Sequence, residues 1–132
     1  MAKLGRYAAQ RQKVESITAS KTVTVADCGT NFMVDSAGAT VLTLPTAADA
    51  GAGWWIRVVL TDEPTTSVKI TAAAGELKGL VVAADGADQT DTNASYTIDS
   101  SGNVGDWLEV LCDGSSMYIF GNIEAIADGE FS

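Results

Sequence analysis

Polar and apolar residues alternate with a period of two along much of the chain. The alternation is clearest in residues 22–25 (TVTV), 67–71 (SVKIT) and 95–99 (SYTID). Successive side chains of a β-strand point to opposite faces of a sheet, so this pattern predicts strands with one buried face. Residues 54–60 (WWIRVVL) are apolar almost throughout, and they predict a more deeply buried strand.

The strongest local signal is a pair of apolar runs, residues 106–112 (DWLEVLC) and 115–121 (SSMYIFG), separated by Asp113 and Gly114. An Asp-Gly pair between two such runs favours a tight turn, because glycine accepts positive backbone φ angles. We therefore predict a β-hairpin at this place. Further strands are predicted at residues 31–35, 40–44 and 79–83.

These segments recur about every ten residues, which is the spacing of an all-β domain. We expect an antiparallel β-sandwich or a small β-barrel of about eight to ten short strands. The chain shows no alternation of strands with helices, which disfavours a doubly wound nucleotide-binding fold. Residues 46–53 are expected to form a loop of small residues, and residues 84–94 an exposed polar loop.

The first 20 residues lack the alternation. We expect residues 1–20 to form an extended N-terminal arm and residues 21–132 to form the β-rich body. The best helical candidate in the arm is residues 6–15. This segment is short, because an isolated helix is marginal below about 12–15 residues. We therefore expect it to be extended or to form a single helical turn.

Charge is distributed unevenly along the chain, whose formal net charge is −9. Residues 1–21 carry five basic residues against one acidic residue, a net charge of +4, and residues 22–132 carry three against 16, a net charge of −13. The acidic body repels nucleic-acid phosphates and anionic membranes, so we expect neither as a partner. The basic arm is either a solvated tail or a segment that docks on an acidic partner surface. Docking is favoured by the apolar residues of the arm, which are Leu4, Tyr7, Val14 and Ile17.

The composition excludes several kinds of chemistry. The chain has 132 residues, the size of one domain, and it contains no histidine. Catalysis by Ser-His-Asp or Cys-His groups and histidine-bearing zinc or haem sites are therefore excluded. With no apolar stretch of signal-peptide length, the chain is expected in a cytosol-like compartment, where reduced thiols are the default. The sequence leaves open whether Cys28 and Cys112 pair.

The acidic residues form no recognisable catalytic or metal-binding pattern. Asp62 and Glu63 are adjacent on a predicted turn, where they lack the burial that tunes the pKa values of catalytic carboxylates. Asp85, Asp88 and Asp91 are evenly spaced but lack the residue order and the closing glutamate of an EF-hand. We therefore predict no catalytic residue, no metal site and no cofactor, and we expect the protein not to be an enzyme.

Two adjacent tryptophans, Trp54 and Trp55, lie on the most apolar predicted strand. Adjacent strand residues face opposite sides of a sheet, so one indole ring is expected in the core. The other ring faces a second layer, a partner subunit or solvent, and tryptophan is enriched at binding hot spots. Trp54, Trp55 and Phe131 are our candidates for a subunit interface. Stacking of Trp54 or Trp55 on a carbohydrate is a further hypothesis.

The order of the segments carries a resemblance to a known class of proteins. Residues 6–13 (RYAAQRQK) lead into residues 22–27 (TVTVAD), and a loop rich in alanine and glycine follows the strand that ends at Pro45. The other matching segments are residues 31–35 (NFMVD), 39–45 (ATVLTLP), 105–107 (GDW), 110–114 (VLCDG), 117–119 (MYI) and 121–122 (GN). This arrangement covers most of the chain and resembles small virion structural proteins of tailed bacteriophages, especially capsid decoration (cement) proteins.

The resemblance implies a β-rich structural protein, commonly trimeric, without enzymatic activity or cofactor. Such proteins are assembled in the host cytoplasm and lie on the outside of the icosahedral shell, where they bridge neighbouring major capsid proteins. In several relatives a terminal arm makes the capsid contacts. Carried over to this chain, that arm is residues 1–20, and the expected capsid contacts are Lys3, Leu4, Arg6, Tyr7, Arg11 and Lys13.

Two alternatives stay open. Related strand patterns occur in phage tail-fibre and tail-tip modules, which contact the host surface; loops such as residues 84–94 would then bind the host receptor. A carbohydrate-active or carbohydrate-binding β-sandwich would instead need a cleft with facing acidic residues and an exposed tryptophan. Deletion of residues 1–20 separates the first alternative from a decoration protein, which should still fold but lose the capsid.

Overall fold

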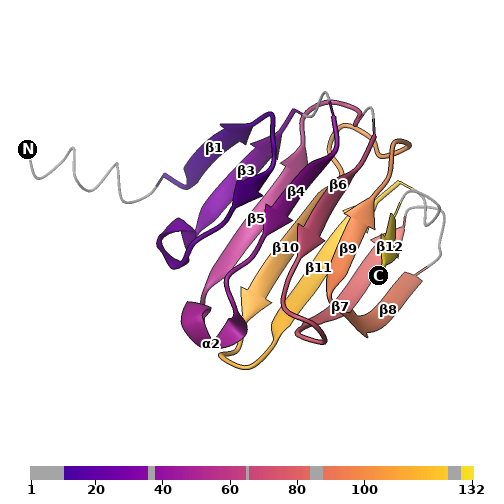
Figure 1. Cartoon of the computed structure of the whole chain (residues 1–132). Coiled ribbons are helices and arrows are strands. Elements are labelled where there is room, and N and C mark those ends of the chain that lie inside the picture. Colours follow the sequence, from indigo (N-terminus) through magenta and orange to yellow (C-terminus); the bar gives the residue numbers. More distant parts are fainter. Residues whose placement is uncertain (1–10, 36–37, 65, 84–87, 125–128) are drawn as a thin grey trace, which may run out of the picture.

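The computed structural model of the chain describes residues 11–35, 38–64, 66–83, 88–124 and 129–132. Strands dominate these residues and form two mixed sheets of seven and five strands (Figure 1). The elements are β1 (Lys13–Ile17), β2 (Lys21–Thr22), the 3-10 helix η1 (Val25–Asp27), β3 (Thr30–Val34), β4 (Thr40–Thr43), the α-helix α2 (Ala47–Ala50), β5 (Trp55–Leu60), β6 (Val68–Thr71), β7 (Leu77–Ala83), β8 (Asp88–Asn93), β9 (Ser95–Ile98), β10 (Trp107–Cys112), β11 (Met117–Ile123) and β12 (Gly129–Phe131).

The first half of the chain winds back and forth between the two sheets. The strands β1, β3, β5 and β7 belong to the seven-stranded sheet, whereas β2, β4 and β6 belong to the five-stranded sheet. In the seven-stranded sheet β1, β3 and β5 are parallel neighbours, with Lys13 paired to Thr30 and Thr30 paired to Ile56. The strands β2, β4 and β6 are parallel in the same way. The segments that lead from one sheet to the other and back differ in length, so the sequence shows no fixed repeat.

The predicted hairpin, β10 and β11, fills the centre of the seven-stranded sheet. The strand order is β1-β3-β5-β10-β11-β7-β8, so β10 pairs antiparallel with β5 and β11 pairs parallel with β7. Gly114 in the hairpin turn has a φ of 96°, as the Asp-Gly signal predicts. The Asp113 carboxylate supports the turn by accepting hydrogen bonds from the backbone N–H groups of Ser115 and Ser116 at 2.8 and 2.7 Å. The order of the five-stranded sheet is β12-β9-β6-β4-β2.

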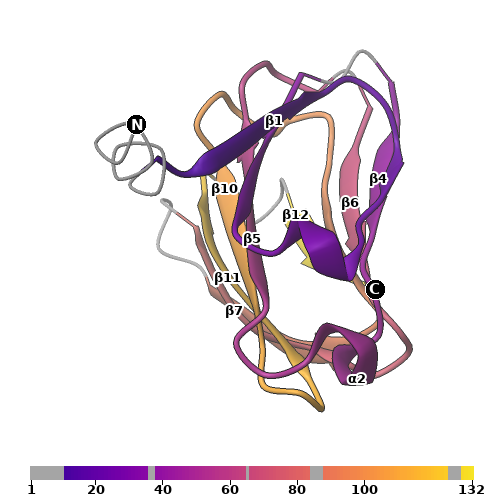
Figure 2. The ribbon, with the colours of Figure 1, turned by 90° about the vertical axis from the view of Figure 1, so that its left-hand side faces the viewer.

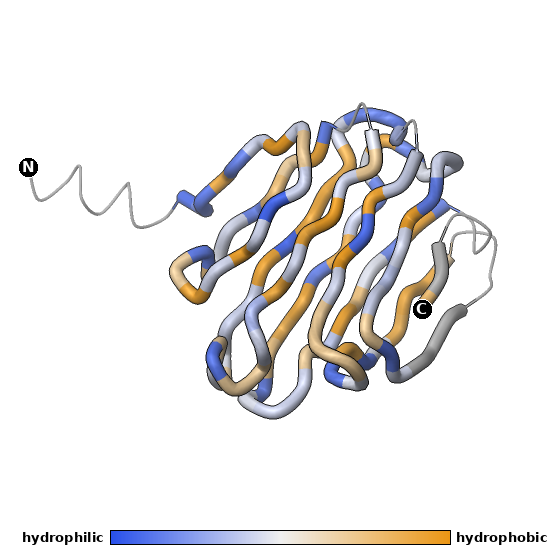
Figure 3. The backbone as a smooth tube through the Cα atoms, in the orientation of Figure 1, coloured by the Kyte–Doolittle hydropathy of each residue, from blue (hydrophilic) through white to orange (hydrophobic). Residues whose placement is uncertain are grey.

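The two sheets lie face to face, and their inward side chains form one hydrophobic core (Figure 2). Strand alternation produces this arrangement. In β5 the inward residues Ile56, Val58 and Leu60 are buried, whereas the residues between them are half-buried. Leu42 and Ile70 on the five-stranded sheet are also buried. The hydropathy of the backbone trace shows hydrophobic positions recurring along the strands of both sheets (Figure 3).

The prediction of an all-β fold is confirmed, but the strand arrangement differs from the antiparallel one that was expected. Among the described residues five strand pairs are parallel and five are antiparallel. Over the same residues the sheets do not close into a barrel, because β1, β8, β2 and β12 remain edge strands. Parallel pairing arises here because each crossover to the other sheet returns the chain in the same direction.

The described residues contain twelve strands, more than the eight to ten expected. The additional strands are short or polar edge strands, which give no period-two signal. Residues 84–94, expected to be a loop, contain β8, whose backbone pairs with β7. Residues 46–53, also expected to be a loop, contain α2, where the Thr46 side chain caps the first turn by accepting from the N–H of Asp49 at 3.1 Å.

Candidate protein-binding face

The outward side chains of four adjacent strands, β5, β10, β11 and β7, form a largely apolar surface. Alternation buries every second side chain of these strands in the core and turns the others away from it. We call this surface, on the outer side of the seven-stranded sheet, the apolar face (Figure 2). The strand registers arrange it in three rows: Trp55–Leu111–Tyr118–Lys78, Arg57–Glu109–Phe120–Leu80 and Val59–Trp107–Asn122–Val82.

Several large side chains of the apolar face are open to solvent in the isolated chain. Phe120 and Leu111 expose 42% and 41% of their surface, and Leu80, Val82 and Trp107 are also exposed. Exposed apolar residues that are scattered singly are normal on a protein surface. Here they occupy neighbouring positions in one register, and a contiguous apolar patch of this kind marks a surface that binds another molecule.

The outer face of the five-stranded sheet provides an internal comparison. Its outward residues Thr43, Lys69, Thr71 and Thr97 are exposed or half-buried, and Val41 is half-buried. A sheet with polar residues on one face and apolar residues on the other is typical of a solvated sheet surface. The two outer faces of this protein therefore differ in character, and the seven-stranded sheet departs from the solvated pattern.

An ion pair lies at the centre of the apolar face. Arg57 on β5 donates hydrogen bonds to Oε2 of Glu109 on β10, from Nε at 3.2 Å and from Nη2 at 2.8 Å. The guanidinium carbon also lies 5.8 Å from the centre of the Trp107 ring, within the range of a cation–π contact. The Lys78 ammonium donates to Oγ of Ser116 at 2.9 Å. The face thus balances most of its charge internally.

Two adjoining hollows border Trp107 at one edge of the apolar face. The first, of about 330 Å³, is lined by Arg57, Val59, Gly105 and Trp107. The second, of about 320 Å³, is lined by residues 104–107 and 122–124. Both are open depressions rather than enclosed cavities, and each places an aromatic ring beside polar side chains. The two hollows make this edge of the apolar face uneven, whereas the surface of a plain sheet is flat.

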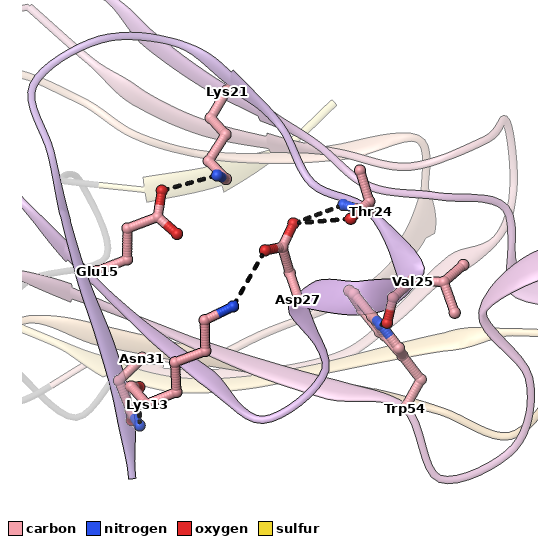
Figure 4. Close-up of polar contacts among 8 residues, drawn as sticks. All are labelled: Lys13, Glu15, Lys21, Thr24, Val25, Asp27, Asn31 and Trp54. Atoms are coloured by element: carbon pink, nitrogen blue, oxygen red, sulfur yellow. Dashed lines mark hydrogen bonds and ion pairs between the residues drawn. The ribbon is translucent and has the colours of Figure 1, made fainter.

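The strand β1 brings charged residues together beside η1 (Figure 4). The Lys13 ammonium lies 3.6 Å from Oδ1 of Asp27, and the Lys21 ammonium donates to Oε1 of Glu15 at 2.7 Å. The second edge of β1 pairs with no strand of the described residues. Its backbone N–H and C=O groups along that edge are of the type that can accept a strand from another chain.

The buried carboxylate of Asp27 has a pKa below its ordinary value. Desolvation by burial raises the pKa, but the backbone N–H and hydroxyl of Thr24 and the positive charges of Lys21 and Lys13 outweigh it. The pKa of Lys21 is raised, chiefly by its hydrogen bond to Glu15, against an opposing effect of burial. Both shifts favour the charged forms of Asp27 and Lys21.

The expected capsid contacts are placed differently along the N-terminal segment. Residues 13–17 of the expected arm form β1, so this part of the segment is built into the sheet. Arg11 is exposed just before β1, and Lys13 is exposed although it pairs with Asp27. The other expected contacts, Lys3, Leu4, Arg6 and Tyr7, lie outside the described residues.

The three residues suggested for a subunit interface are separated by the fold. Trp54 is 3% exposed, and its Nε1 donates to the carbonyl oxygen of Val25 at 3.2 Å, so it belongs to the core. Phe131 is half-buried and meets the ring of Tyr96 edge-on, with ring centres 4.8 Å apart. Trp55 is half-buried and lies on the apolar face.

Sequence reasoning does not single out Leu80, Leu111 or Phe120, which lie on the apolar face. A signal for them exists in the two strands of the hairpin. Residues 107–112 (WLEVLC) and 117–120 (MYIF) carry apolar residues at both odd and even positions. A strand with one solvated face should alternate, so this pattern indicates strands that are covered on both sides.

Other features of the described residues point to no further chemistry. Cys28 is exposed and Cys112 is buried, and both are free thiols. Over the described residues we find no group of three or more acidic or cysteine side chains that could hold a metal ion. No described helix is long and apolar enough to cross a membrane. Comparison with protein-family models, curated proteins and solved structures finds no match to this chain.

Proposed function

We propose that this protein is a structural component of a tailed-bacteriophage virion, which decorates the outside of the icosahedral capsid as a trimer and bridges neighbouring major capsid proteins. The apolar face carries the proposal, because a contiguous exposed apolar surface serves contact between proteins. The assignment to a capsid rests on the resemblance in the sequence. In this proposal the body is a β-sandwich and residues 1–20 are an arm that contacts the shell.

The charge distribution supports a binding role for the arm. The net charge of +4 in residues 1–21 suits an acidic shell exterior, since opposite potentials steer the encounter and fix the register of two proteins. The edge of β1 that pairs with no strand of the described residues supports a contact in which a strand of the capsid protein extends the seven-stranded sheet. Many copies on one shell would multiply a modest affinity of each arm.

The proposal is tested by cosedimentation of the purified protein with expanded, undecorated capsids at low and high salt. We expect saturable binding at a fixed ratio to the major capsid protein. Weaker binding at high salt would assign part of the affinity to exposed charges, which salt screens. Absence of binding at both salt concentrations would reject the decoration role and favour a tail-fibre or tail-tip module.

A pair of charge-reversal variants makes the test specific to the arm. We expect Arg11→Glu to weaken capsid binding, because Arg11 is exposed and lies in the basic segment. Lys69→Glu is the matched control, since it makes the same change of charge on the outer face of the five-stranded sheet. Lys13 is left unchanged because it pairs with Asp27. Equal loss of binding in both variants would indicate a general effect of net charge.

Glycan binding is a second candidate function, favoured by the hollows beside Trp107. An exposed indole ring can stack on a sugar, and Asn122 and Glu124, which line the second hollow, could hydrogen-bond its hydroxyl groups. A glycan array followed by titration of tryptophan fluorescence tests this function. Saturable binding that Trp107→Ala abolishes and Trp55→Ala retains would support it, and failure to bind any glycan would remove it.

A further inference from the structure

We propose that copies of this chain contact one another through the apolar face, with Leu111, Phe120 and Trp107 in the subunit interface. The inference deepens the proposed function, on which it rests for the number of copies, three. The contact between copies rests on the face itself. It assigns the apolar face to the oligomer and leaves the basic N-terminal segment to the capsid.

The charge balance of the face favours a second copy over a partner of opposite charge. Arg57 is held by Glu109 at 2.8 Å, and Lys78 donates to Ser116 at 2.9 Å. Arg57 and Glu109 neutralise each other, and Lys78 leaves the face with a net charge of only +1, so another apolar surface with little net charge complements it best. The same face on another copy has that composition, and in a ring of three copies one part of each apolar face would pack on a different part of the next copy's apolar face.

Most of the exposed acidic residues that the structure describes lie away from the face, although Glu124 borders it at the second hollow. Each chain carries a net charge of −9, so two copies repel one another over most of their surface. In the described residues many exposed acids lie in the connections at the ends of the strands. Among these are Asp35, Asp49, Asp62, Glu63 and Asp113. Copies can therefore approach through the apolar face while these acidic residues stay outside the contact.

The centre of the face is built to be covered by a partner. A buried ion pair is tolerated when both groups keep their hydrogen bonds, and Arg57 already donates twice to Glu109. The hollow lined by Arg57, Val59, Gly105 and Trp107 leaves room for a side chain of the partner to insert. Aromatic residues such as Phe120 and Trp107 are enriched at protein interfaces, and tryptophan is among the residue types that carry most binding energy there.

Sedimentation velocity of the full chain at micromolar concentration tests the contact. We expect a species of three times the chain mass of 13.6 kDa, which dissociates on dilution. Its mass should be unchanged in about 1 M salt, where exposed charges are screened beyond roughly 3 Å. A single-chain mass at all concentrations would overturn the inference, and a stable dimer would keep the contact but reject the number three.

Variants at the centre of the face show which surface holds the copies together. Phe120→Glu and Leu111→Glu should sediment at the single-chain mass, because each places a charge within the apolar contact. Thr43→Glu is the matched control on the outer face of the five-stranded sheet, and it should keep the oligomer. If the circular dichroism of the glutamate variants is not native, Leu111→Gln replaces them. It should raise the subunit dissociation constant about tenfold, which corresponds to about 1.4 kcal/mol.

The outcomes distinguish failure of the inference from failure of the proposed function. If Phe120→Glu folds and keeps its oligomeric mass, the inference is wrong. If that variant also loses cosedimentation with capsids, the apolar face binds the capsid protein instead of a second copy. If the unmodified chain forms a trimer that Phe120→Glu disrupts but never binds capsids, the inference stands and the decoration role fails.

Discussion

Asp27 accepts two hydrogen bonds from Thr24 at the start of η1, from the backbone N–H at 2.8 Å and from the hydroxyl at 3.1 Å. Only 8% of the Asp27 surface is exposed, and its second carboxylate oxygen lies 3.6 Å from the ammonium of Lys13. This one carboxylate therefore ties η1 to β1, the edge strand that follows the basic segment. The contact adds a charge interaction to the backbone pairing that holds β1 against β3.

We expect Asp27→Asn to lower the free energy of unfolding by about 1–3 kcal/mol at neutral pH, because charged hydrogen bonds within a buried site are lost. The pKa of Asp27 is lowered by folding. Its contribution is therefore present above the ordinary aspartate pKa of about 3.9 and is lost as the pH falls through the lower pKa of the folded state. Urea unfolding of both proteins should show a difference at neutral pH that shrinks in acid. A difference independent of pH would contradict the assignment.

Thr30 offers a test of an unpaired buried hydroxyl. Its side chain is fully buried, and Oγ1 has no hydrogen-bond partner among the described residues. Thr30→Val keeps the shape and removes the hydroxyl, so we expect the unfolding free energy to rise by about 1 kcal/mol. Thermal unfolding followed by circular dichroism measures the change. Thr30→Ser, which keeps the hydroxyl and removes a methyl group, should lower Tm, and a lower Tm for Thr30→Val would reveal a partner for the hydroxyl.

Gly79 on β7 marks a close approach of two strands. A Cβ atom at this position would overlap the carbonyl oxygen of Ile119 on the neighbouring strand β11. We therefore expect Gly79→Ala to lower the unfolding free energy by about 3 kcal/mol, because a backbone atom must move. Gly38→Ala is the control, since a Cβ atom there meets no atom within 4 Å. Chemical denaturation compares the two variants, and similar losses in both would argue against the close approach.

The two adjacent tryptophans should respond differently to the same substitution. Trp54→Phe removes the hydrogen bond to Val25 and leaves a gap in the core, so we expect a loss of about 1–3 kcal/mol in unfolding free energy. Trp55→Phe changes a half-buried residue of the apolar face and should alter it by about 0.5 kcal/mol or less. Urea unfolding at a concentration where the chain is monomeric compares them. A larger loss of unfolding free energy for Trp55→Phe than for Trp54→Phe would contradict the placement of Trp54 in the core.

The sequence is informative about where strands lie and much less about how they pair. Residues 54–60 and the Asp113–Gly114 turn predict β5 and the hairpin closely, because burial on one face and the turn geometry are local properties. Alternation says which face of a strand is buried, but not the direction of its neighbour, so the parallel winding could not be predicted. The strand β8 (DQTDTN) has no apolar residue and is formed through its backbone pairing with β7.

The candidate site shows the same division. The pair of Trp54 and Trp55 can be noticed from sequence, because adjacent residues of a strand face opposite sides of a sheet, but the sequence does not say which of the two rings faces outward. Leu111 and Phe120 are apolar residues in apolar strands, and only the registers that place them beside Glu109 and Tyr118 reveal a continuous face. Which apolar residues of a strand face outward as a group is a tertiary property, fixed by the sheet order.

The winding of the chain between two sheets also determines how quickly the protein can fold. Lys13 pairs with Thr30, and Leu77 pairs with Met117. The segments between these residues must close into loops, at a cost in chain entropy, before the strand pairs contribute to stability. The β10–β11 hairpin needs only its short turn and can form within about 1–10 μs. β5 pairs with one strand of that hairpin and β7 pairs with the other, so the hairpin connects two segments that are distant from it in the sequence. The two halves of the seven-stranded sheet can thus be joined only after β10 and β11, which are synthesised late, have left the ribosome.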